Sequence, residues 1–207
     1  MGHPIRILTV DDHPLLREGI ASLVGTQPDL AIIGEASSGR EAVDLFRALR
    51  PDITLMDLRM ADMNGIEAIT QIASEFPDAK IIVLTTYSGD AQIVRALKAG
   101  AQGYLLKGLL RKELLDTIRA VNAGKKRVSP EVASQVAEYA IDGALTTREI
   151  DVLQLIAQGN ANKLVADRLS ITEDTVKAHV KSILSKLGAN DRTHAVTIAL
   201  KRGIIDL

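Results

Sequence analysis

The chain has 207 residues, of which 46% are hydrophobic and 25% are charged, with a formal net charge of −1 and no cysteine. The absence of cysteine excludes disulfides, thiolate nucleophiles and cysteine-ligated zinc, and so small a net charge favours neither nucleic acid nor a membrane surface as a partner. No segment reaches the about 20 apolar residues that a membrane-spanning helix needs, and the first residues carry no secretion signal, so we expect a soluble cytoplasmic protein.

Short apolar runs typical of β-strands alternate with helical patterns from residue 5 to about residue 123. The predicted strands are 5–10, 30–36, 52–57, 80–86 and 103–107, and the predicted helices are 14–26, 39–49, 65–75, 91–99 and 111–123. Each strand is hydrophobic almost throughout, which is typical of burial on both sides. Five such strands alternating with five helices predict an α/β fold with a parallel sheet covered on both faces.

Polar side chains stand at the carboxyl ends of four predicted strands: Asp11 and Asp12 after the first, Asp57 at the third, Thr85 at the fourth and Lys107 at the fifth. A flavodoxin-like sheet of order 2-1-3-4-5 would gather these ends in the crevice where open α/β sheets bind ligands. Three carboxylates need a cation, for which Mg²⁺ is suited, and the added hydroxyl and lysine favour phosphoryl transfer to an aspartate. Taken singly, each residue also fits a helix cap, a turn or a solvated strand end.

The motifs VDDH, LMDLRM with NG after it, VLTTY and GYLLK resemble, in this order, the receiver domain of bacterial two-component response regulators. The resemblance extends over residues 4–124. It implies that Asp57 accepts a phosphoryl group from a sensor histidine kinase. It also implies that Asp12, Asp57 and the backbone carbonyl of Arg59 hold Mg²⁺, while Asp11 acts mainly through water.

The same resemblance assigns three further residues. It implies that Thr85 hydrogen-bonds the phosphoryl group, that Lys107 pairs with it, and that Tyr104 is a switch aromatic residue, for which a half-buried strand tyrosine is the alternative. Two positions depart from many relatives, because Ala61 stands where proline is usual and Gly108 where aspartate or proline is frequent. Neither departure removes a reactive group.

From residue 125 onward the pattern changes to helices alone. Residues 125–142 are predicted to form a linker with a short helix at 130–139. Thr146 and Glu149 have the spacing of a capping box, and the helix that they begin ends at Gly159. Three more helices follow at 162–169, 173–187 and 192–204. We therefore expect a receiver domain at 1–124, a linker at 125–142 and an all-α four-helix domain at 143–207.

The third of these helices has one apolar and one basic face. Its apolar face comprises Val176, Val180, Ile183, Leu184 and Leu187. Ala178 and Lys181 lie opposite, with Lys177 at the edge. Two short helices joined by a tight turn, the second with such a face, fit a helix that reads the DNA major groove. An interaction module with merely solvated lysines fits the same geometry.

The run LTTREIDVLQLIAQG and the segments after it resemble the LuxR-type DNA-binding domain over about 143–207, and its combination with a receiver is typical of the NarL/FixJ type. The resemblance implies double-stranded DNA as a partner and a homodimer on activation, with residues 193–201 as the dimer contact. It places Lys177, Ala178 and Lys181 at base edges and Thr175, His179 and Lys186 at backbone phosphates. Leu164 stands where relatives usually have glutamate.

Together these features predict a DNA-binding response regulator in which phosphorylation of Asp57 controls dimerisation, DNA binding and transcription. The chain would then be no enzyme beyond self-catalysed phosphotransfer and dephosphorylation. One alternative is a Mg²⁺-dependent phosphohydrolase with Asp57 as nucleophile, although Arg59 stands where haloacid-dehalogenase-like enzymes usually need a second acid. Another is a DNA-binding regulator that has lost phosphorylation, against which the intact set of site residues argues.

Overall fold

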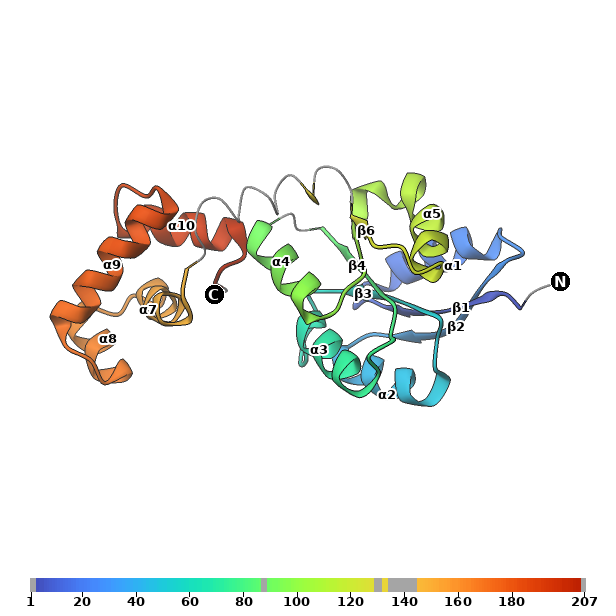
Figure 1. Ribbon diagram of the computed structural model, residues 1–207, viewed down its shortest axis with the longest axis horizontal. Helices are drawn as coiled ribbons and strands as arrows, with labels where there is room; N and C mark the ends of the chain where they lie inside the picture. The colour runs from blue at the N-terminus through green and yellow to red at the C-terminus, as the bar shows by residue number, and fades with distance from the viewer. Residues whose placement is uncertain (1–2, 87–88, 129–131, 134–144, 206–207) are drawn as a thin grey trace. The chain divides into compact units, whose positions relative to one another are not determined.

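The computed structural model describes residues 3–86, 89–128, 132–133 and 145–205, and the chain divides into two compact units (Figure 1). The first unit contains residues 1–88 and 93–132, and the second contains 133–207 together with 89–92. The predicted linker helix at 130–139 lies, apart from 132–133, outside the described residues. No helix in the described part of the chain is both long and apolar enough to cross a membrane.

The first unit is built on a parallel sheet of order β2-β1-β3-β4-β5-β6. Its strands are β1 (Ile5–Val10), β2 (Leu30–Ala36), β3 (Ile53–Asp57), β4 (Ile81–Thr85), β5 (Gly103–Leu106) and β6 (Arg127–Val128). The predicted fold class and the order 2-1-3-4-5 are confirmed. The sixth strand was not predicted, because it has only two residues and lies in the expected linker, where it pairs with Gly103 and Tyr104 of β5.

Helices cover both faces of this sheet, as predicted. They are α1 (Pro14–Gly25), α2 (Gly39–Leu49), α3 (Gly65–Glu75), α4 (Asp90–Ala99) and α5 (Leu110–Asn122), and a 3₁₀ turn, η1 (Lys107–Leu109), precedes α5. In Figure 1, α1 and α5 lie above the strands, and α2 and α3 lie below them. On the upper face, Ile20 of α1 and Ile118 of α5 are buried in one apolar cluster with Leu55 of β3.

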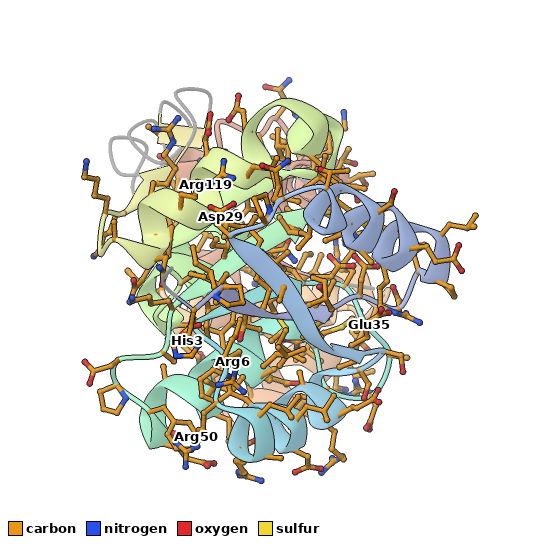
Figure 2. The ribbon with its side chains drawn as sticks, turned by 90° about the vertical axis from the view of Figure 1, so that its right-hand side faces the viewer. His3, Arg6, Asp29, Glu35, Arg50 and Arg119 are labelled. Carbon is orange, nitrogen blue, oxygen red and sulfur yellow. The ribbon has the colours of Figure 1, made fainter. Side chains whose placement is uncertain are left out.

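Arginines tie helices to the sheet at the amino ends of the strands. Figure 2 shows Arg119 of α5 beside Asp29, which directly precedes β2. The Arg119 guanidinium donates two hydrogen bonds of 2.8 and 2.9 Å to the Asp29 carboxylate. Arg6 of β1 donates to the carbonyls of Leu49 and Arg50, at 2.7 and 3.0 Å, and so caps the end of α2. These contacts fix the helices at the amino-terminal ends of the strands, whereas the predicted site lies at the carboxyl ends.

The segment between β3 and α3 folds back tightly on the end of β3. Asn64 caps α3 and forms a capping box with Glu67. The Gly65 amide donates to the Leu58 carbonyl at 3.0 Å, and a Cβ atom at Gly65 would lie 2.0 Å from the Asp57 carbonyl oxygen. Glycine is therefore required at position 65, because a side chain there would collide with the backbone of Asp57. This close approach lets the buried strand β3 end in Asp57 and lead directly into a turn.

The second unit is a helical domain, as predicted. Its helices are α7 (Thr147–Ala157), α8 (Asn162–Leu169), α9 (Glu173–Leu187) and α10 (Arg192–Arg202). The predicted cap at Thr146 is present and Thr172 caps α9, while Gly188 and Gly203 end α9 and α10 in the left-handed conformation. One apolar core joins the helices; its fully buried members include Val152, Val165, Val176, Ile183 and Ala199.

Candidate functional site

The strand register of the first unit brings three predicted site residues together. Val10 of β1 pairs with Met56 of β3, so Asp11 and Asp57 follow at the same level of the sheet. Thr85 of β4 pairs with Leu106 of β5, which places Lys107 one residue beyond the strand, at the start of η1. The Lys107 Nζ atom lies 2.7 Å from Asp11 Oδ2 and 2.8 Å from Asp57 Oδ2. All three side chains are at least nine-tenths buried.

An open cleft of about 630 Å³ gives access to this group. It is lined by His13, Leu15, Leu16, Asp57, Arg59, Thr86 and Lys107. Thr85 is buried at the end of β4, whereas its neighbour Thr86 is exposed. The backbone N–H of Leu58 donates to Asp57 Oδ1 at 2.7 Å, so each oxygen of the Asp57 carboxylate accepts a hydrogen bond. The carboxylate of Asp57, the predicted nucleophile, is thus held in a fixed orientation where it lines the open cleft.

The charges in this site are unbalanced. Burial raises the pKa of Asp57, and the hydrogen bond and charge of Lys107 offset this only in part. Burial also opposes the charged form of Lys107, but its hydrogen bonds to Asp11 and Asp57 prevail and raise its pKa. One lysine therefore neutralises a group that contains three acids, counting Asp12, and the remaining negative charge favours a divalent cation.

The ligand atoms for such a cation converge at the mouth of the cleft. Single ligand atoms of Asp11, Asp12, His13 and Asp57 all lie within 4.8 Å of one another. Carboxylate oxygens are the donors that Mg²⁺ prefers, so the three predicted acids fit that ion. His13 was not predicted, although its position directly after two acids in VDDH was a usable signal. The role of the Arg59 carbonyl as a ligand stays a prediction.

Tyr104 is buried in β5 rather than half-buried. Burial, together with the charge of Asp57, raises the pKa of its hydroxyl above the ordinary value, so the ring stays neutral. The role of Tyr104 as a switch stays a prediction.

In the second unit, α9 presents the face that the sequence predicts. Lys177, Ala178 and Lys181 are exposed, and Lys177 forms an exposed ion pair of 2.9 Å with Asp174. Thr175 and His179 are half-buried, and Thr175 shares the helix cap with Thr172. The two lysines and the small alanine between them leave this face of the helix open to a groove.

Lys186, predicted to contact phosphates, is held by a partner that the sequence did not indicate. Its Nζ atom lies 2.7 Å from Oε2 of Glu149, a carboxylate that is almost completely buried in α7. Ser182 donates to Oε1 of Glu149 at 2.6 Å, and the backbone N–H of Thr146 donates to Oε2 at 2.7 Å. This network joins the start of α7 to the second half of α9. Ser182 and Lys186 lie 33 and 37 residues after Glu149 in the sequence, so no local sequence pattern could have revealed these contacts.

Comparison with known proteins gives consistent matches along the chain. The family model of the response regulator receiver domain matches residues 7–119, and that of the bacterial regulatory proteins of the luxR family matches residues 143–199. Response regulator protein VraR of Staphylococcus aureus is 42% identical over 206 residues, which cover 97% of this chain and 99% of VraR.

Two solved structures extend this similarity to the fold. The response regulator ChrA of a heme-sensing two-component system has a TM-score of 0.59 and 35% identity, over 99% of this chain and 100% of ChrA. RcsB from Salmonella enterica serovar Typhimurium, bound to a promoter in the presence of the phosphomimetic BeF3−, has a TM-score of 0.75 and 25% identity, over 97% and 100% of the two chains.

Proposed function

Because this chain belongs to the DNA-binding response regulators of two-component systems, with a receiver domain and a LuxR-type domain, we propose that a sensor histidine kinase phosphorylates Asp57 and thereby controls dimerisation, DNA binding and transcription. Both proposed partners, the catalytic part of the kinase and the operator DNA, would place the protein in the cytoplasm. The reaction would be limited to phosphotransfer onto, and hydrolysis from, its own Asp57.

The observation that carries this proposal is the bridge from Lys107 to Asp11 and Asp57 at the base of the open cleft. In the transfer, an Asp57 oxygen forms a bond to phosphorus as the bond between phosphorus and the donor nitrogen breaks. Lys107 supplies a positive charge where the phosphoryl oxygens would lie, and the Leu58 N–H holds the carboxylate plane. Thr85, buried at the end of the neighbouring strand, is proposed to hydrogen-bond the transferred group.

Asp11, Asp12 and Asp57 are the residues that would hold Mg²⁺, with the Arg59 carbonyl proposed as a further oxygen ligand. The chemistry that Mg²⁺ supplies when bound is neutralisation of charge on the transferring phosphoryl oxygens. The excess of acids over Lys107 in this site supports the assignment.

Phosphorylation would act by redistributing the contacts of Lys107. The phosphorylated side chain carries a charge of about −1.5 to −2 in place of the −1 of the Asp57 carboxylate, so the charge of the site becomes more negative by about 0.5 to 1. Lys107 already has two carboxylate partners and must exchange contacts to meet the new group. A nearly complete conversion between two states needs about 5.5 kcal/mol of differential stabilisation. One charge-assisted hydrogen bond contributes roughly 1.5–3 kcal/mol, so we propose that dimer and DNA contacts supply the remainder. Tyr104, beside this site in β5, is proposed to relay the change.

On the DNA side, we propose that Lys177, Ala178 and Lys181 of α9 contact base edges in the major groove. Their exposure supports this role, as does the RcsB relative solved on promoter DNA. Thr175 and His179 are proposed to contact phosphates, and residues 193–201 of α10 to form the dimer contact. For Lys186, a phosphate contact would compete with its ion pair to Glu149.

Two measurements on the full chain test the proposal: intact mass after incubation with Mg²⁺ and a small phosphodonor, and affinity for DNA selected from a random pool. The parent should gain the mass of one phosphoryl group and bind the selected DNA more tightly. Asp57→Asn should gain neither property. Asp62→Asn, which changes an exposed acid in the loop after β3, is the matched control and should behave as the parent.

Other outcomes point to the rival functions. Rapid multiple turnover of the phosphodonor without a stable adduct would identify a phosphohydrolase. No adduct, or full modification with unchanged DNA affinity, would identify a regulator that acts independently of phosphorylation.

A further inference from the structure

His13 stands at the mouth of the cleft without a role in the proposed reaction. Its imidazole is 70% exposed, and the Nδ1 atom lies 2.7 Å from Asp12 Oδ1 and 3.1 Å from Asp11 Oδ1. Its backbone N–H also donates to Asp11 Oδ1, at 2.9 Å, which holds the residue at the end of β1. The Nδ1 side of the ring therefore faces the acids, while most of the ring is exposed to solvent.

The distances around Nδ1 suit a shared cation. For metal–ligand bonds of about 2.1 Å, adjacent corners of an octahedron lie about 3.0 Å apart. The separations of Nδ1 from the two carboxylate oxygens, 2.7 and 3.1 Å, lie on either side of that value. Without a cation, these distances are those of hydrogen bonds from an Nδ1–H to the two carboxylates. A cation would take the place of that proton: a neutral imidazole with its proton on Nε2 presents a lone pair at Nδ1, so the ring could then occupy one such corner.

The donor set of this cleft is thus three carboxylates and one imidazole rather than oxygen atoms alone. Mg²⁺ prefers oxygen ligands, and an imidazole nitrogen adds little to its binding. First-row transition ions accept imidazole readily, and Mn²⁺ among them also suits carboxylates. The same cleft would therefore discriminate between ions of equal charge.

We propose that His13 is a ligand of the divalent cation and gives this receiver a preference for Mn²⁺ over Mg²⁺. The inference rests on the proposed function, because it assumes that the acidic cleft binds a divalent cation. It adds a nitrogen ligand and a metal selectivity that the acids do not provide. Phosphorylation would then be supported by Mn²⁺ at lower concentrations than by Mg²⁺.

The test measures metal binding to the full chain without any phosphodonor. Bound Mn²⁺ is quantified by loss of the free-ion paramagnetic resonance signal, Mg²⁺ by competition, and a nitrogen ligand by its hyperfine coupling to bound Mn²⁺. His13→Ala keeps the backbone N–H that bonds Asp11. His3→Ala, which changes another exposed histidine outside the cleft, is the matched control. Thermal unfolding of both variants verifies that the fold is retained.

We expect His13→Ala to weaken Mn²⁺ binding by about tenfold or more, in the range typical for altered metal sites, and to remove the nitrogen coupling. Mg²⁺ binding should change by less than about twofold, and His3→Ala should change neither ion. If His13→Ala weakens the binding of both ions equally, or if the parent shows no nitrogen coupling, His13 only orients Asp12. Either result would overturn the inference while leaving the metal site intact. A parent that binds neither ion would overturn the proposed metal site itself.

Discussion

Glu149 offers a stringent test of how the DNA-binding unit is held together. Glu149→Gln keeps the shape of the side chain and its capacity for the capping box, but it removes the negative charge that faces Lys186. In the parent, burial alone would raise the pKa of Glu149, yet hydrogen bonds from Lys186, Ser182 and Thr146 prevail and lower it from 4.5 to about 2. The substitution therefore leaves the lysine without its ionic partner.

The expected loss of stability in Glu149→Gln follows from that pKa. A pKa lowered from 4.5 to about 2 corresponds to about 3 kcal/mol of stabilisation at neutral pH, because each tenfold change in proton affinity is worth about 1.4 kcal/mol. Only 5% of the side chain is exposed, so screening by water reduces this value little. A unit of about 60 residues is stable by roughly 3–9 kcal/mol, so the loss is a large part of the total. The expected fall in Tm is about 10–20 °C.

Calorimetry of the full chain at pH 7 measures this effect. Glu173→Gln, which changes an exposed acid in the first turn of α9, is the matched control and should shift the unfolding free energy by less than about 0.5 kcal/mol. Because the folded-state pKa of Glu149 is below the unfolded one, its contribution is complete above about pH 4.5 and is lost as the pH falls toward 2. A Glu149→Gln variant as stable as the control at pH 7, with the same acid sensitivity as the parent, would refute the reasoning.

Four further predictions concern single substitutions. Lys181→Ala should weaken binding to the selected DNA by about 1–3 kcal/mol and relax its sequence preference, whereas Lys186→Met should lower the Tm and leave the salt dependence of DNA binding unchanged. Gly65→Ala should destabilise the first unit by about 1–3 kcal/mol in denaturant unfolding and slow phosphorylation, since its Cβ would press on the Asp57 carbonyl. Lys107→Ala should raise the pKa of the Asp57 carboxyl further, as followed by carbon NMR, because the hydrogen bond and charge of Lys107 lower it in the parent.

The fold of the first unit could be predicted because its local patterns agree with its tertiary structure. Uniformly apolar strands signalled burial on both faces, and the alternation with helices implied parallel order, which placed Asp11 level with Asp57. Strand β6 escaped prediction because its two residues, Arg127 and Val128, carry no periodicity. Its existence depends on the open edge of β5, which is a property of the assembled sheet.

Glu149 shows where sequence reasoning ends. Its local role was predictable, because a capping box needs only the three-residue spacing from Thr146, and that contact is present. Its second role was not, because its partners Ser182 and Lys186 lie in another helix, 33 and 37 residues further along the chain. In the structure, Ser182 and Lys186 bend toward the buried carboxylate. The burial of Glu149 and the identity of its cationic partner both follow from the packing of α7 against α9.

Lys107 and Lys186 differ in how many carboxylates they contact, and this difference bears on which contacts phosphorylation can change. Lys107 faces two carboxylates with Asp12 nearby, so its contacts can be redistributed when a phosphoryl group arrives. Lys186 is matched to one carboxylate whose two oxygens both accept hydrogen bonds, so α9 is fixed against α7. We therefore expect phosphorylation to change how DNA-binding units pair, and not the internal position of α9.

Amide hydrogen exchange tests this expectation without DNA. Phosphorylation should slow exchange at the carboxyl ends of β4 and β5, where the contacts of Thr85 and Lys107 change. The buried half of α9, around Val176 and Ile183, should exchange as slowly as before, because the Glu149 network already holds it. Asp57→Asn, treated with the same phosphodonor, separates phosphorylation from any direct effect of the reagent. A change of protection at Val176 or Ile183 in the phosphorylated parent alone would mean that the signal reaches the interior of the DNA-binding unit.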